Sequence, residues 1–579
     1  MPLPKYNGLL THTARVRGGI SRRVLKIATV LLAAVATDAT AQRATGPWED
    51  GSIAPRGVLR IGINPRFANW NERYSRDNSA REPLGTDFTR DSLGPAPAFL
   101  PYVAGLAPAL TTLTGLASPP LSLGMLQTRL NVTEVQTHIT IDYGLNSRLG
   151  LQALVPYVKN RVYVSAIPNQ GDVGATLGFN PSRSFPGARQ QNDLVVSTLG
   201  AATSTLSSEL VRCQGISDPS CTAINADRAG ATALVQQATQ VSGALATVYG
   251  TSALAGALYA PVAGGALHTA VDARLTAINA QFRNFLGAPP SGEWVNGRPV
   301  AASLMAASDF DRLINGEESG ISGRAMADYE HSHVGDIELG AKFILLDTFG
   351  SPGATLPPPH AGAIRVAAAG IYRLGTGQLD LPHDFTDVGT GDRQADIEVR
   401  GFGDLALSTK FWVSAIARFA LQQPDQLVRR ITDQPGDPFP ELVREQEVDR
   451  DLGDVIEFEV APRFVPNDEF SLSALYRYRH KGVDTYDGTF LVNSADGTAL
   501  SLDASTLGLG TEQTDQMFGF AITFSTVRAY ARNAGRWPIE VSFMHTQTLS
   551  GKGVPRQSMN GFALRLYRPI RGNVLKAAK

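Results

Sequence analysis

The residues of this chain best placed to do chemistry are charged side chains that alternate with apolar ones along strand-length segments. Between residues 334 and 343, Asp336, Glu338 and Lys342 occupy even positions, and the odd positions from 337 to 343 are apolar. A β-strand directs neighbouring side chains to opposite faces, so this segment has one apolar face and one ionic face. Acids and bases on such a face can pair with one another, or an arginine can bind the anionic group of a solute.

The same alternation recurs along the chain and yields a set of charges that share the ionic faces. We expect these side chains to line an interior: Asp336, Glu338, Lys342, Arg365, Arg373, Asp396, Glu398, Arg400, Arg418, Glu457, Glu459, Arg463, Arg477, Arg479, Glu540 and Arg565. In any one segment, the ionic face could equally look at water from a soluble sandwich, as it does in many antiparallel sheets.

The number, length and spacing of the alternating segments favour a membrane barrel over a sandwich. About twelve are recognisable, near 57–68, 127–143, 148–164, 333–347, 361–377, 394–407, 410–422, 452–465, 468–482, 511–526, 536–550 and 558–570. Many exceed the roughly 5–6 residues of a soluble strand, whereas a tilted membrane strand needs roughly 9–11. Connections after the second, sixth and eighth segments are tight, and those after the first, third, seventh and ninth are long. Short connections thus tend to follow even-numbered segments and long ones odd-numbered segments. This parity of loop lengths predicts an all-β fold: a transmembrane antiparallel β-barrel of about twelve strands, with short periplasmic turns and long outer loops.

The N-terminal residues have the pattern of an export signal. Basic residues between 15 and 26 precede the apolar run 27–36, and Ala39-Thr40-Ala41 supplies a small-residue cleavage site. The run is shorter than the roughly 20 residues of a membrane anchor. We therefore expect a signal peptide over 1–41 and a barrel domain over 42–579 in the bacterial outer membrane. Its partners would be outer-membrane lipid and the barrel-assembly machinery.

Two insertions interrupt the strand pattern, and by parity both belong to outer loops. The first, near 75–126, is rich in proline. The second, 165–332, is mostly helical, with helices expected over 192–212, 222–249 and 266–285. Cys213 and Cys221 are the only cysteines, and after export we expect them to form a disulfide that clips a helical hairpin. The insertion could cap the lumen or form a surface domain without a transport role.

Composition and motifs argue against several classes of function. The net charge of −1 gives no basis for nucleic-acid binding. The chain has no G-x-S-x-G, P-loop or H-E-x-x-H motif, so we expect no enzyme and no cofactor. His331 and His333 share a strand face and could hold a metal, but without a third ligand in view a solvated loop explains them equally, and we predict no metal site.

Three short motifs resemble one family of outer-membrane proteins. The stretch 141–151, IDYGLNSRLGL, continuing to the VPYV of 155–158, resembles a YGLTDRLxLGxxxPYV hairpin of the family labelled for the meta pathway of phenol degradation. GDIELGAK at 335–342 resembles its GDxxLGAKY strand, and RLGTG at 373–377 its LPTG strand end. The resemblance implies a barrel transporter, similar in character to long-chain fatty-acid transporters, for hydrophobic or aromatic compounds. The large helical insertion and the C-terminal Val574–Lys579, which lacks a terminal aromatic residue, depart from that pattern.

These observations together predict a passive channel or transporter for small molecules, with the solute unidentified. Two interpretations of the lumen remain open. Acids and arginines could pair across it and largely fill it, or Arg463, Arg477 and Arg479 could line a path that favours anionic or aromatic acids. The alternative function is a surface structural or adhesive protein, in which the barrel anchors the helical insertion.

Overall fold

The computed structural model describes residues 47–89, 102–170, 174–289, 292–349, 359–434 and 437–570. The expected signal peptide, 1–41, lies outside these residues, and so do the C-terminal residues 571–579.

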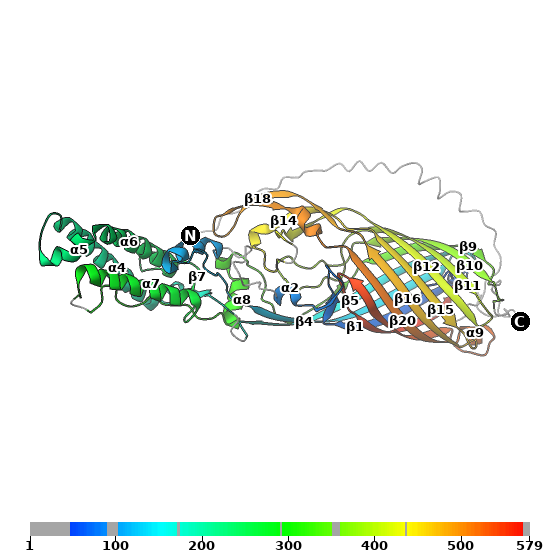
Figure 1. The fold of residues 1–579 in the computed structure, drawn as a ribbon. Coiled ribbons are helices and arrows are strands. Elements are labelled where there is room, and N and C mark those ends of the chain that lie inside the picture. The colour runs from blue at the N-terminus through cyan, green and yellow to red at the C-terminus, as the bar shows by residue number, and fades with distance from the viewer. Residues whose placement is uncertain are drawn as a thin grey trace, which may run out of the picture.

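A closed antiparallel barrel forms one half of the molecule (Figure 1). Its strands are β1 (Val58–Trp70), β4 (Leu126–Gly144), β5 (Leu149–Pro168), β9 (Ile337–Asp347), β10 (Ile364–Leu374), β11 (Asp396–Ala406), β12 (Phe411–Gln422), β15 (Val455–Phe464), β16 (Phe470–Lys481), β20 (Gln513–Ser525), β21 (Ile539–Lys552) and β23 (Ser558–Pro569). Each strand pairs with its sequence neighbour, and β1 pairs with both β4 and β23, which closes the ring. The predicted twelve-stranded barrel is confirmed.

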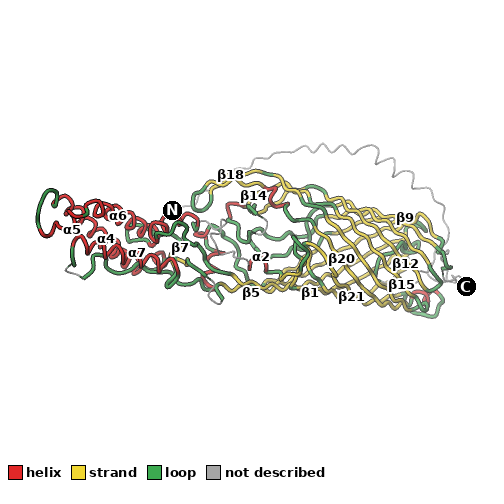
Figure 2. The backbone as a smooth tube through the Cα atoms, viewed as in Figure 1, coloured by secondary structure: helices red, strands yellow, loops and turns green. Residues whose placement is uncertain are grey.

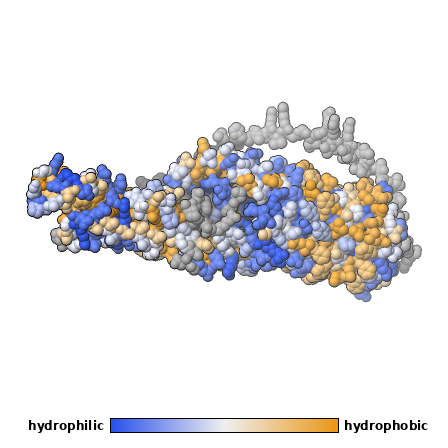
Figure 3. Space-filling model, in the orientation of Figure 1, coloured by the Kyte–Doolittle hydropathy of each residue, from blue (hydrophilic) through white to orange (hydrophobic). Residues whose placement is uncertain are grey.

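The two-residue alternation sets which side chains face lipid and which face the lumen. On β11, Asp396, Glu398 and Arg400 are buried, whereas Ile397 and Val399 between them are 44% and 56% exposed. The outward positions of the other strands are likewise apolar, and Figure 3 shows the resulting hydrophobic surface over the barrel. An apolar band around a closed barrel with a charged interior is the surface of a transmembrane barrel of the outer-membrane type.

The outer edge of the apolar band is visible on β5. Tyr157 points outward and is 46% exposed, and the next outward side chains, Lys159 and Arg161, are charged. Both form ion pairs with Glu330 of β8 (Tyr329–Val334), a short strand that pairs with β5 beyond the end of β9. A tyrosine at this boundary places its ring against lipid and its hydroxyl near water.

Loop lengths follow the predicted parity. Turns 145–148, 407–410 and 465–469 at the periplasmic end are short, and 348–363 and 526–538, with α9 (Val527–Ala531), are intermediate. The long connections 71–125, 169–328, 423–454 and 482–512 all leave the opposite end, where 375–395 is intermediate and only 553–557 is short. Small elements near that mouth are α2 (Thr86–Thr89), β2 (Glu72–Tyr74), β3 (Arg81–Pro83), β22 (Val554–Pro555), β13 (Asp425–Arg430), β14 (Glu445–Asp451), β17 (Thr485–Asp487), β18 (Thr489–Asn493) and β19 (Ala499–Asp503) (Figure 2).

The helical insertion projects from the outer end, beyond these small elements (Figure 1). Its elements are α4 (Pro186–Arg212), α5 (Thr222–Ala226), α6 (Arg228–Tyr249), α7 (Ala266–Leu286) and α8 (Ala307–Asn315), with β6 (Leu177–Phe179) paired to β7 (Tyr259–Pro261). By length and composition α4 could cross a membrane, but Leu199 and Leu206 on its apolar side are buried in a core shared with α6. The first insertion contributes to the same core, because α3 (Ala107–Thr114) packs on α6 and α7.

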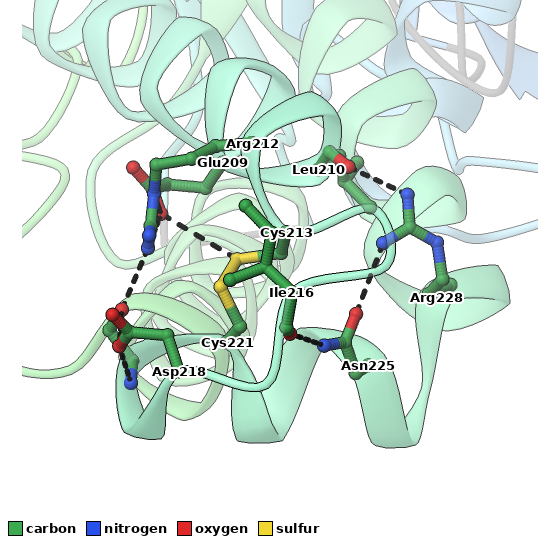
Figure 4. The surroundings of a disulfide bond; sticks show 10 residues. Glu209, Leu210, Arg212, Cys213, Ile216, Asp218, Cys221, Asn225 and Arg228 are labelled. Atoms are coloured by element: carbon green, nitrogen blue, oxygen red, sulfur yellow. Dashed lines mark hydrogen bonds and ion pairs between the residues drawn. A yellow bond between two sulfur atoms is a disulfide. The ribbon is translucent and has the colours of Figure 1, made fainter.

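A disulfide joins Cys213, just after α4, to Cys221, just before α5 (Figure 4). Around it, Arg212 contacts both Glu209 and the hydroxyl of Ser220, and Arg228 donates to the carbonyl of Leu210. The predicted disulfide is thus present, and it closes the turn of the helical hairpin.

Candidate functional site: a plugged lumen

The segment before β1, residues 47–57, lies inside the barrel. Its path past the end of β4 requires a glycine there, since a Cβ on Gly144 would meet the carbonyl oxygens of Ala54 and Pro55 at 2.2 Å. The amide of Gly57 donates to the carbonyl of Gly144 at 2.7 Å and fixes the segment at that point. We call residues 47–57 the plug.

Two acidic residues attach the plug to the barrel wall. Glu49 forms ion pairs with Arg400 of β11 at 2.8 Å and Arg418 of β12 at 3.3 Å. Asp50 pairs with Arg463 of β15 at 3.1 Å, and both of these side chains are buried, at 7% and 2% exposure. Buried charges of this kind are costly to separate, because each would be left without a partner in a poorly solvated space.

Backbone hydrogen bonds add to these ion pairs. Lys342 of β9 donates from Nζ to the carbonyl oxygen of Asp50 at 2.9 Å. The amide of Gly51 donates to Asp404 of β11 at 3.1 Å. The plug is therefore held by side chains from four strands, β9, β11, β12 and β15.

Trp48 anchors the plug on its apolar side. Its indole is 9% exposed and clusters with Ala461, Leu475, Ala521 and Met544, which come from strands β15, β16, β20 and β21. The charged contacts reach strands β9 to β15 and the indole reaches β15 to β21, so the plug contacts a large part of the ring of strands.

A cavity lies on each side of Trp48 and Glu49. The one toward the outer end has a volume of about 330 Å³ and extends to residues at the outer ends of the strands, such as Gln422 and Lys481. The one on the other side, about 100 Å³, is lined by residues nearer the periplasmic end, such as Arg60 and Asp142. We call the larger one the outer cavity.

Most of the charges predicted to face the lumen meet in one network on the wall from β9 to β15. Arg373 pairs with Glu338 at 3.0 Å and Glu398 at 3.2 Å, and Arg400 pairs with the same two acids at 2.9 and 2.5 Å. Arg373 also pairs with Asp396 at 2.6 Å. The network continues to β15, where Arg418 pairs with Glu457 and, at 2.9 Å, with Glu459.

The remaining predicted residues lie elsewhere on the wall. Arg365 pairs with Asp347 and Asp404 near the periplasmic end, and Arg565 pairs with Glu540 at 3.2 Å. Arg477 binds Asp515 at 2.5 Å. Arg463, Arg477 and Arg479 do not form one path, because Arg463 is engaged by the plug, whereas Arg477 and Arg479 line the outer cavity.

Asp336 does not join the charged network. It lies between β8 and β9, and its carboxylate accepts hydrogen bonds from the amides of Gly377 at 2.7 Å and Asp392 at 3.1 Å. It therefore holds the outer loop 375–395 against the barrel. Asp336 precedes β9, and its partners are backbone amides of that loop rather than arginines of the wall.

Several residues of the outer cavity were missed by the sequence analysis. They are Trp48 and Glu49 of the plug and, on the wall, Arg66, His138, Met517, Met544, Thr546 and Met559. The two-residue alternation could have predicted the wall residues. Met517, for example, precedes the outward Phe518 and so faces inward. The plug carries no periodic signal.

The two histidines considered as metal ligands lie on β8, where His333 is exposed. Within the described ranges, no group of three or more His, Cys, Asp or Glu side chains is arranged to hold a metal ion.

Comparison with known proteins gives structural neighbours but no family. No family model matches the chain, and no curated protein matches it. A COG4313 outer-membrane channel from Pseudomonas putida F1 aligns with 8% identity and a TM-score of 0.37, over 90% of this chain and 100% of that one. The Ralstonia pickettii toluene transporter TbuX aligns with 7% identity and a TM-score of 0.26, over 89% and 90%. A Pseudomonas aeruginosa FadL homologue aligns with 6% identity and a TM-score of 0.24, over 93% and 100%. TM-scores this low carry no functional argument.

Proposed function

We propose that this chain is a passive outer-membrane channel for small molecules with apolar, including aromatic, bodies, closed at rest by its own plug. The observation that carries the proposal is the outer cavity, which ends on Trp48 and Glu49 of the plug. A barrel stabilised only by filling its interior would have no reason to leave such a space at the outer end.

The way in which the plug is attached supports a removable closure. Its ion pairs from Glu49 and Asp50 reach side chains far away in sequence, and among the described residues it is joined covalently to the barrel at β1. Release of residues 47–53 would break a few polar contacts, one indole cluster and the packing of Ile53 on the wall, without disturbing any strand pairing. The cavities on the two sides of Trp48 and Glu49 could then join.

Apolar side chains in the outer cavity favour solutes with an apolar body. Met517, Met544 and Met559 come from three adjacent strands, β20, β21 and β23. Methionine is flexible and polarisable and adapts to different apolar shapes, including aromatic rings.

Liposome flux tests the proposal. A variant lacking residues 47–52 should pass small neutral solutes faster than the full chain. In gel electrophoresis, both proteins should show a band that shifts on boiling, which indicates a folded barrel. Empty liposomes are the baseline. If flux through both proteins equals that baseline, the channel function is wrong and the interior serves only to stabilise the barrel.

A second candidate function rests on the projection of the helical insertion away from the barrel (Figure 1). No residue of α4 to α7 lines the outer cavity. This arrangement suits a surface domain displayed by a barrel anchor. Replacing 186–286 by a short linker should then leave flux unchanged and abolish adhesion of cells that express the protein. A change in flux would instead give the insertion a role in gating.

A further inference from the structure

We propose that the outer cavity contains a binding site for a small organic monocarboxylate, with Arg66 and Arg479 facing its charge and the three methionines contacting its apolar body. This inference rests on the proposed channel function and names the class of solute that the channel takes.

The first observation is that two lumenal arginines have no acidic partner. Arg373, Arg400, Arg418 and Arg477 all form ion pairs. Arg66 and Arg479 also line the outer cavity, yet neither has a carboxylate within ion-pair distance among the residues that the structure describes. The nearest acids in the sheet to Arg479 are its cross-strand neighbours, Glu457 of β15 and Asp515 of β20, and neither forms an ion pair with it. Arg66 has a neutral hydrogen-bonding partner, the Asn64 amide, whose oxygen accepts from Nη2 at 3.2 Å once the amide is oriented to satisfy both of its ends.

Guanidinium groups that form no ion pair in a partly enclosed space attract an anion. Moving a charge away from bulk water is unfavourable unless an opposite charge and hydrogen bonds replace the water. A guanidinium presents several donors in a planar fork that matches the two oxygens of a carboxylate. A carboxylate in the outer cavity would therefore relieve the electrostatic cost that Arg66 and Arg479 impose.

The second observation is an unsatisfied hydroxyl in the same cavity. Thr546 is 2% exposed, lines the outer cavity, and its Oγ1 has no hydrogen-bond partner among the described residues. A buried hydroxyl without a partner is uncommon in a native fold and is satisfied by water or by a ligand. The wall of the outer cavity thus offers a hydrogen-bonding group as well as positive charge.

The positions of these residues around the barrel suit a ligand with one charged end. Arg66 lies on β1 and Arg479 on β16, and the strands between them are β23, β21 and β20. Those three strands supply Met559, Met544 and Met517. The arginines therefore flank three adjacent strands that each contribute a methionine, against which an aromatic or short aliphatic body can lie.

The acids of the outer cavity limit the charge of the ligand. The acids that line the outer cavity are Glu49, Glu338, Asp392, Glu398, Glu457 and Glu459. A dianion or trianion would meet repulsion from these acids, one of which, Glu457, is the cross-strand neighbour of Arg479, whereas a single negative charge meets less of it. The volume of about 330 Å³ is at the lower end of the roughly 300–1,000 Å³ of small-molecule pockets and so suits a compact solute.

Benzoate, with its neutral analogue benzamide, is the probe. The full chain, folded in detergent, is titrated with each by calorimetry. We expect benzoate to bind at least 10-fold more tightly than benzamide. Equal affinities for benzoate and benzamide would overturn the proposal. So would inorganic phosphate that displaces benzoate as effectively as unlabelled benzoate does.

Variants locate the site. Arg66→Gln and Arg479→Gln should each weaken benzoate binding about 10-fold and leave benzamide binding unchanged. The matched control is Arg161→Gln, which removes an exposed arginine on the outer face of β5, and should change neither. Unaltered benzoate affinity in both lumenal variants would contradict the assignment, whatever the wild-type preference.

The outcome is separable from that of the channel proposal. If removal of residues 47–52 raises the flux of neutral solute but benzoate is not bound preferentially, the channel function is supported and the carboxylate site is wrong. Benzoate binding that depends on Arg66 and Arg479, without any flux, would support the site and overturn the channel.

Discussion

Oε1 of Glu49 lies 2.8 Å from Nη1 of Arg400, so a carboxylate from the N-terminal segment is bound by a guanidinium of the barrel wall more than three hundred residues away in sequence. Arg418 holds the other oxygen of the same carboxylate at 3.3 Å. The plug therefore occupies the lumen through contacts of the kind that an anionic solute could also make.

Neutralising Glu49 should loosen the plug. In Glu49→Gln, two ion pairs are lost and a neutral amide remains, so we expect more frequent openings in single-channel recordings and a higher mean conductance. Glu49 is more than a third exposed, and the effect should be modest, about 1 kcal/mol or less in the closing equilibrium. Glu330→Gln, which breaks exposed pairs on the outer face, is the control and should behave as wild type.

Removing Asp50 should have a larger effect. Asp50→Ala leaves the buried guanidinium of Arg463 without its partner, which costs about 3–5 kcal/mol in comparable buried pairs. The thiol of a Ser52→Cys reporter, at a position that is 5% exposed, should then react with maleimide on the order of 10²-fold faster. A second substitution, Arg463→Met, removes the stranded charge and should restore part of the protection. An unchanged labelling rate in Asp50→Ala would show that this pair does not hold the plug.

Reducing the disulfide should destabilise the helical hairpin alone. Cys213 and Cys221 are separated by 8 residues, and closing so short a loop contributes about 2–3 kcal/mol on the chain-entropy account. We expect a lower melting temperature of the helical circular-dichroism signal after reduction, with liposome flux unchanged. A simultaneous change in flux would link the hairpin to the lumen.

Acid should release a contact at the periplasmic end. Burial alone would raise the pKa of Asp468, but hydrogen bonds and attraction from Arg528 and Arg532 of the turn 526–538 outweigh it and hold the pKa below its ordinary value of 3.8. A depressed folded-state pKa stabilises the fold above the ordinary value and ceases to do so as the pH falls through the folded-state pKa. Protease cleavage within 526–538 should therefore accelerate only below about pH 3.8. Asp468→Asn should show the faster cleavage at neutral pH as well.

The barrel was predictable because its signal is local. Period-two alternation places Ile397 outward and Glu398 inward whatever else the chain does, and the turn lengths fixed which end faces the periplasm. The clipped hairpin was equally local, since Cys213 and Cys221 bracket a short polar turn between two helical stretches.

The plug and the shared helical core were not predictable in this way. Residues 47–57 have no alternation, and the partners of Asp50 and Gly51, Arg463 and Asp404, are hundreds of residues away. The core formed by α3 with α6 and α7 joins two insertions separated by two barrel strands, a relationship that no local pattern contains.

A reversible crosslink tests most directly the claim that the plug closes the lumen. A Cβ built on Gly150 of β5 would lie 3.2 Å from the Cβ of Ile53 in the plug, close to the 3.5–4.5 Å or so that a disulfide spans. In Ile53→Cys/Gly150→Cys, oxidation should lower liposome flux toward the level of empty liposomes, and reduction should restore it. Each single-cysteine variant should respond to neither treatment. Flux through the double variant that stays the same in its oxidised and reduced states would contradict the plug account.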